Sequence, residues 1–233
     1  MWEPETEQTV AHATAANKLI EQLTEQLGLS TFDIKSERHQ VAYPLLKSSI
    51  DVAAAATRLL MLDPVQYGSA AESLFRPQLE RYLRAVYFGS PILTTDEQVH
   101  AFLDDDKIDI AFGPLVTKAS DVIVNQSAQP DPTLSALFAT IIIATKDDLH
   151  GAVHGGRLVV RRYLNEYLAF NPWVLSHGLA IQAVMFLSML AFSQFAVLKG
   201  AKQLESTLDF AKMLVEAIPA MRSAVDPSTP LMD

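Results

Sequence analysis

Apolar residues recur at helical spacing through most of this 233-residue chain, and this pattern constrains the fold more than any other feature. Near the N-terminus they fall three and four positions apart, at Leu19, Ile20, Leu23 and Leu27. Proline and glycine separate successive apolar runs, and no useful stretch alternates with the two-residue period of a strand. We therefore expect an all-α, single-domain multi-helix bundle of about seven to nine helices that spans residues 1–233.

The expected helices begin with an N-terminal one, 5–28, placed at the periphery, and the tail, 224–233, is expected to be frayed. Between them, the apolar periodicity and the Pro, Gly and Asp stops predict helices over 41–62, 69–88, 95–103, 115–124, 131–143, 145–168, 173–198 and 202–222. Pro44 is assigned to the first turn of its helix. Pro77 predicts either a kink in the third helix or the true start of that helix.

Residues 178–198 contain 21 positions without a charge, which is long enough to cross a bilayer. Four polar side chains interrupt this stretch, and neither an aromatic belt nor a Lys/Arg cluster flanks it. A helix surrounded by partners inside a bundle has the same apolar character on all sides. We expect a central core helix near 173–198 and no membrane span.

Composition excludes several classes of function. A formal charge of −9 argues against non-specific nucleic-acid binding, so DNA is not an expected partner, although a local basic patch could bind RNA or a nucleotide. The absence of Cys excludes disulfides and thiolate metal sites. The acidic, polar N-terminus is the opposite of a secretory signal, and we expect a cytoplasmic protein. No Walker A loop, dinucleotide fingerprint or Gly-x-Ser-x-Gly elbow occurs.

Residues 147–162, DDLHGAVHGGRLVVRR, hold two of the six histidines and three of the nine glycines. On a helix, His150 and His154 lie one turn apart on the same face, with Asp147 on the same edge. Such imidazoles can bind a divalent metal, with Asp147 as a further ligand, or transfer protons. The alternative is that both histidines are buried polar anchors bonded to carboxylates or carbonyls.

Arg157 and Arg161 follow the histidines one helical turn apart. Arginine forks match phosphate oxygens, so these two residues are candidate ligand-binding residues. The alternative is a solvent-exposed basic helix face.

Four residues of alternating charge follow one another at four-residue intervals and form what we call the charged ladder: Glu72, Arg76, Glu80 and Arg84. A stripe of this kind usually faces solvent. Pro77 and the dense apolar residues around it favour partial burial instead. A buried Arg76 needs a carboxylate and a buried Glu80 needs a donor, which the two histidines of 147–162 would supply.

These motifs resemble a family of bacterial helical proteins of unknown function. The family combines an RPxLE helix, here residues 76–80, with a downstream LHGxxHGG segment, here residues 149–156, and the similarity extends over about 43–198. More distantly the chain resembles the HEPN helical bundles, many of which are metal-independent RNases or nucleotide-binding modules of toxin and phage-defence systems. Active HEPN proteins place an Arg four to six residues before a His, and no Arg precedes His150, His154 or His177 at that distance.

Three hypotheses follow. The first is a binding or regulatory helical module, expected to be a homodimer and to need no cofactor, in which an Arg/Glu/His cluster is a structural network. The second is an enzyme acting on RNA or nucleotides, with the candidate catalytic residues Arg76, Glu80, His150 and His154. The third is a divalent-metal site at His150, His154 and Asp147, with Glu80 nearby. Each depends on the charged ladder and the histidine segment lying side by side.

Overall fold

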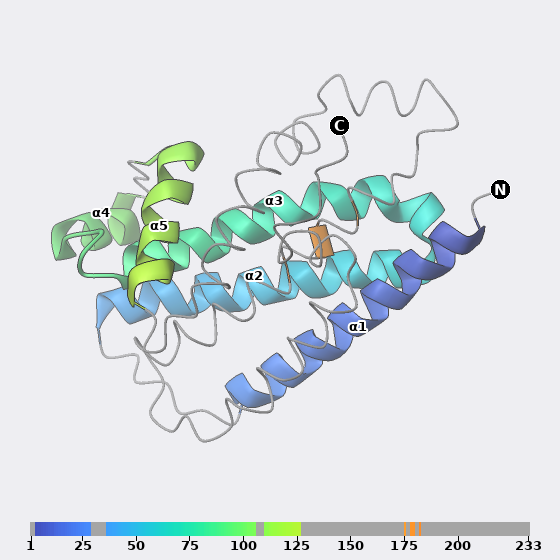
Figure 1. Ribbon diagram of the computed structural model, residues 1–233. Helices are drawn as coiled ribbons and strands as arrows, with labels where there is room; N and C mark the ends of the chain where they lie inside the picture. The colour runs from blue at the N-terminus through green and yellow to red at the C-terminus, as the bar shows by residue number, and fades with distance from the viewer. Residues whose placement is uncertain are drawn as a thin grey trace.

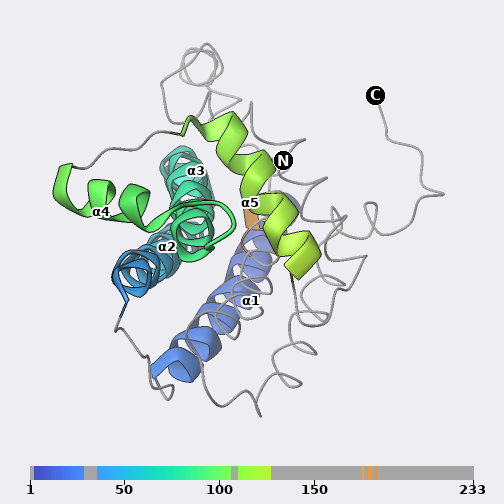
Figure 2. The same cartoon turned by 90° about the vertical axis from the view of Figure 1, so that its left-hand side faces the viewer.

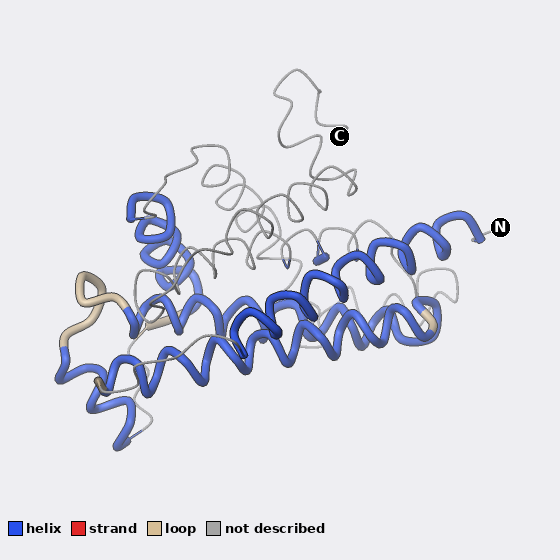
Figure 3. The backbone as a smooth tube through the Cα atoms, turned by 90° about the horizontal axis from the view of Figure 1, so that it is seen from below, coloured by secondary structure: helices blue, strands red, loops and turns tan. Residues whose placement is uncertain are grey.

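Five α-helices make up the main part of this computed structural model, which describes residues 3–28, 36–105 and 110–126 and the four residues 175, 178, 179 and 182. The helices are α1 (Glu3–Gly28), α2 (Glu37–Leu62), α3 (Pro64–Gly89), α4 (Asp96–Asp105) and α5 (Phe112–Gln126). Within these ranges every regular element is a helix and no strand occurs (Figure 3). The all-α prediction is confirmed. The expected count of seven to nine helices extends beyond the described residues.

The centre of the structure is the pair α2 and α3, which run side by side in opposite directions (Figure 1). A single residue, Asp63, joins them. Its backbone N–H donates to Leu59 O at 3.2 Å and so closes α2. Its side-chain oxygen accepts from the N–H groups of Val65 at 2.9 Å and Gln66 at 3.0 Å and so caps α3. Pro64 begins α3, where its missing N–H costs nothing. One Asp–Pro pair thus produces a sharp reversal between two 26-residue helices.

The other helices pack around this pair. Helix α1 contacts mainly α2. Helix α4 lies against the start of α2, and α5 packs on α3. Seen along the axis of α3, α4 and α5 lie on opposite sides of it (Figure 2). Leu19 and Leu23 of α1 are buried in the same core as the centre of α3. The largest fully buried side chains are Tyr82, Phe75, Leu19, Leu23, Leu60, Leu79, Leu83 and Leu115. The apolar periodicity of the sequence is therefore the pattern that builds this core.

The structure corrects one prediction for each of the two prolines inside helices. Pro44 is not in the first turn of α2, because Ser36 caps that helix earlier by accepting a hydrogen bond from His39 N at 3.3 Å. Pro77 does not begin the third helix, because α3 runs continuously from Pro64 through Pro77 to Gly89. The Asp63 cap sets the start of α3, and tertiary packing keeps the helix intact past the proline.

Four described residues beyond α5 belong to one helical face that enters the core. Leu175, Leu179 and Gln182 are buried, and Leu175 and Leu179 join the same apolar cluster as α3. At Gly178 a Cβ atom would lie 2.1 Å from an atom of the Phe75 ring. The absence of a side chain at Gly178 therefore lets this helix approach α3 at Phe75.

Residues 173–198 were expected to form a central core helix. The burial of Leu179 and Gln182 against the bundle agrees with that expectation at the positions that the structure describes, and the remainder lies outside them. None of the described helices combines the length and the hydropathy that a bilayer span requires.

The contact between Gly178 and Phe75 predicts the effect of one added methyl group. Gly178→Ala is expected to lower the free energy of unfolding by about 1–3 kcal/mol, because the methyl group overpacks the core. Gly113→Ala is the matched control: a Cβ there meets nothing within 4 Å, so the change should be neutral or stabilising by up to about 1 kcal/mol. Urea unfolding of both variants measures the difference. Equal stability of the two would contradict the packing described here.

Candidate functional site

Three residues of the charged ladder on α3, Arg76, Glu80 and Arg84, form a connected ion network centred on Glu80. Arg84 binds one carboxylate oxygen of Glu80, with Nη2 at 2.7 Å and Nε at 3.3 Å from Oε1. Arg76 faces the other oxygen at a longer range, with Nε 3.9 Å from Oε2. Glu80 thus lies between two guanidinium groups, one held by charge-assisted hydrogen bonds and one by a looser ion pair.

The partial burial expected for the charged ladder is confirmed. The side chains of Arg76, Glu80 and Arg84 are 11%, 28% and 14% exposed, and Glu72 is 2% exposed. Part of this cover comes from α5, where the Arg76 guanidinium carbon lies 4.7 Å from the centre of the Phe112 ring. Cation–π contact of this kind stabilises a guanidinium that has lost water. The ladder is therefore part of the α3–α5 contact and is not an open charged surface.

Within the part of the chain that the structure describes, several buried polar atoms have no hydrogen-bond partner. Among them are Nη1 of Arg84, both amide atoms of Gln78 on α3, and the hydroxyl of Ser120 on α5. An unsatisfied buried polar group costs about 1–3 kcal/mol. The α3–α5 region thus keeps donors and acceptors that its own packing does not use.

The remaining predicted site residues lie outside the described part of the chain. These are His150, His154 and Asp147, with the ligand-binding candidates Arg157 and Arg161. The structure therefore positions Arg76 and Glu80 on one helix edge but does not test whether the histidines meet them. Among the described residues, no group of three or more His, Asp or Glu side chains is arranged to hold a metal ion.

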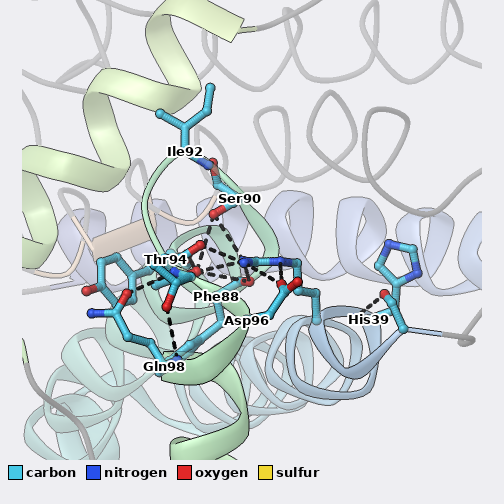
Figure 4. Close-up of polar contacts among 11 residues, drawn as sticks. His39, Phe88, Ser90, Ile92, Thr94, Asp96 and Gln98 are labelled. Atoms are coloured by element: carbon cyan, nitrogen blue, oxygen red, sulfur yellow. Dashed lines mark hydrogen bonds and ion pairs between the residues drawn. The ribbon is translucent and has the colours of Figure 1, made fainter.

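A second polar site, which the sequence did not reveal, surrounds Arg38 at the start of α2. Its guanidinium donates to Thr94 O at 2.6 Å, to Thr94 Oγ1 at 2.8 Å, and to the carbonyls of Phe88 at 3.0 Å and Ser90 at 3.3 Å. It also binds Asp96 Oδ1, with Nε at 2.8 Å and Nη2 at 2.7 Å. Figure 4 shows Phe88, Ser90, Thr94 and Asp96 gathered in this network, which we call the Arg38 cluster.

The Arg38 cluster solves the problem of a helix end. The last carbonyls of a helix lack intrahelical partners, and a cation there also complements the helix dipole. Arg38 supplies hydrogen-bond donors and a positive charge to the end of α3. Its bond to Asp96 fixes the first turn of α4. One side chain thereby joins the starts of α2 and α4 to the end of α3. The sequence contains one usable signal, an Arg two residues after the Ser that caps α2, but nothing in it identifies carbonyl partners fifty or more positions away.

A reciprocal capping box opens α4. Thr95 N donates to Gln98 Oε1 at 2.9 Å, and Gln98 N donates to Thr95 Oγ1 at 3.3 Å, as the spacing of a Thr and a Gln three residues apart indicates. The hydrogen bond of Glu97 with the Thr95 side chain lowers the pKa of its carboxyl group. Negative charge is thereby kept at a helix N-terminus, where the dipole favours it.

Neither a protein-family model, nor a curated protein, nor a solved structure matches this chain. The resemblance drawn from the RPxLE and LHGxxHGG motifs stays a prediction, and function has to be argued from the residues themselves.

The Arg38 cluster predicts a large difference between two substitutions of one ion pair. Arg38→Met should cost about 2–4 kcal/mol of unfolding free energy, because it removes a charged donor from several carbonyl and hydroxyl acceptors at once. Asp96→Asn should cost less than about 1 kcal/mol, since Asp96 is 84% exposed and contributes a solvent-screened partner. Chemical denaturation of both variants gives the comparison. Similar losses would show that the ion pair, and not the carbonyl contacts, holds the cluster.

Proposed function

We propose that this chain is a helical binding or regulatory module in which the charged ladder is a structural polar network. The observation that supports this proposal is the position of Glu80 between Arg84 and Arg76, with Arg76 also stacked on Phe112. Each of these groups is in contact with its own chain. A catalytic arginine or carboxylate has to leave its contacts available to a substrate.

Electrostatics points the same way. The ladder carries two negative and two positive side chains, so it presents no net charge that would attract a polyanion such as RNA. Removing one partner from a buried ion pair costs about 3–5 kcal/mol, and the partial exposure of Glu80 reduces that figure. A phosphate that engaged Nε or Nη2 of Arg84 would have to displace Glu80 against this cost.

A second candidate function is an enzyme acting on RNA or nucleotides, as the distant HEPN likeness implies. One detail favours it: among the described residues, Nη1 of the Arg84 guanidinium has no hydrogen-bond acceptor. That nitrogen could donate to a phosphate oxygen if His150 or His154 lies beside it as a general acid or base.

One substitution separates the two functions. If the ladder is structural, Glu80→Gln should lower the unfolding free energy by about 1–2 kcal/mol, because it leaves two half-buried guanidinium groups without their shared carboxylate. Glu21→Gln is the matched control: Glu21 accepts from the side chain of Asn17 one turn earlier on the exposed face of α1, and the loss of this bond should cost no more than about 0.5 kcal/mol. Denaturation of both variants measures the difference.

The enzyme hypothesis predicts another result for the same proteins. The wild type would cleave RNA or hydrolyse a nucleotide, and Glu80→Gln or Arg76→Gln would remain folded and lose that activity. Such a result would overturn the structural proposal. An inactive wild type and a destabilised Glu80→Gln variant would support it.

The histidine segment enters the proposal from the sequence alone. If His150 and His154 belong to the same structural network, the double variant His150→Ala/His154→Ala loses stability. If they hold a divalent metal with Asp147, protein purified without an affinity tag contains stoichiometric metal that a chelator removes. The homodimer expected from the sequence stays a prediction, which analytical ultracentrifugation of the full chain tests.

A further inference from the structure

The imidazole of His100 lies between two carboxylates from different helices. Its Nδ1 is 3.3 Å from Glu37 Oε1 on α2, and its Nε2 is 3.1 Å from Asp104 Oδ2 one turn later on α4. All three side chains are at least half exposed to solvent. None of them belongs to the charged ladder, so this site is independent of the function proposed above.

Whether both contacts can be hydrogen bonds depends on whether the imidazole ring carries one proton or two. An ionised carboxylate only accepts hydrogen bonds, whereas a neutral imidazole has one N–H donor and one nitrogen with a lone pair. A neutral His100 can therefore donate a hydrogen bond to Glu37 or to Asp104, but not to both. Its other ring nitrogen then directs a lone pair at the remaining carboxylate. Only the doubly protonated ring donates to both carboxylates.

We infer that Glu37, His100 and Asp104 form a proton-operated clasp between α2 and α4. When the ring carries both protons, the clasp holds the middle of α4 against the first turn of α2. When the ring carries one proton, one of the two contacts is lost. Histidine is the side chain that ordinarily changes charge between about pH 5 and pH 8, so the test of the clasp compares α4 at the two ends of that range.

The surrounding charges restrict the response to one part of α4. Arg38 on α2 holds Asp96 at the first turn of α4 through a separate ion pair in which His100 takes no part. Glu97 shares that first turn and is already bonded to Thr95. The proton therefore acts on the helix beyond its first turn.

A positive charge stabilises the C-terminal end of α4. Its last turn contains Asp104 and Asp105 and no basic residue, and negative charge at a helix C-terminus opposes the helix dipole. A protonated His100, four residues before Asp104, offsets this repulsion. Deprotonation thus weakens both the contact with α2 and the last turn of α4 itself.

Hydrogen exchange of the full chain at about pH 5.5 and about pH 8 tests the clasp, with the protection factors of the α4 amides corrected for intrinsic exchange. Protection should fall about two- to fivefold at the higher pH, the size expected for exposed ion pairs. His100→Gln and Glu37→Gln should remove this difference. Asp51→Asn, an exposed carboxylate elsewhere on α2, and His39→Gln, a second histidine near the start of α2, should keep it.

Two outcomes would overturn the inference. One is equal protection of α4 in the wild type at both pH values. The other is a pH effect that survives in His100→Gln, which would assign the proton to another group. Loss of the effect in His39→Gln with retention in His100→Gln would identify that group directly.

Discussion

Charged groups placed among packed helices need partners from their own chain, and this requirement governs both polar sites of the structure. Around Arg38, one partly buried guanidinium satisfies the carbonyls of Phe88 and Ser90 at the end of α3 and the backbone and hydroxyl of Thr94. Because the same group binds Asp96, the direction in which α4 leaves α3 is fixed together with the start of α2. At the opposite end of the α2–α3 pair, Asp63 satisfies the first N–H groups of α3. The central hairpin is therefore held at both ends by side chains bonded to backbone.

The charged ladder meets the same requirement in the middle of α3. Glu80 is shared by Arg84 and Arg76, and Phe112 of α5 covers the Arg76 guanidinium. Removing one partner from such an arrangement lowers the free energy of unfolding strongly, whereas the intact arrangement adds little net stability. Its main effect is therefore to specify which face of α3 meets α5. A binding or regulatory module can use such a face as a fixed frame. Among the described residues, Arg84 Nη1 and the side-chain amide of Gln78 have no hydrogen-bond partner, so the polar contacts of this region are not all satisfied.

Local patterns in the sequence predicted most of the described fold. The helix class, the approximate bounds of all five helices and the Thr95–Gln98 capping box follow from short-range periodicity and capping chemistry, which a single sequence displays. The burial of the charged ladder was also predictable, because apolar residues flank it. The Arg38 cluster and the approach of Gly178 to Phe75 were not, since each joins residues at least fifty positions apart. Whether His150 and His154 meet Glu80 depends on the same kind of long-range contact.

The central claim is that the arginines of the ladder are engaged within the protein, and NMR of the arginine Nε–H groups in the full chain tests it most directly. During titration with inorganic phosphate to tens of millimolar, the Arg84 Nε–H signal should keep its position, because Glu80 Oε1 occupies that donor. Arg81, whose Nη1 makes a long 3.4 Å contact with Ser48 O among the described residues, serves as the internal reference for non-specific ionic effects. A saturable shift of Arg84 that Arg81 does not share would contradict the claim and show that the ladder binds anions.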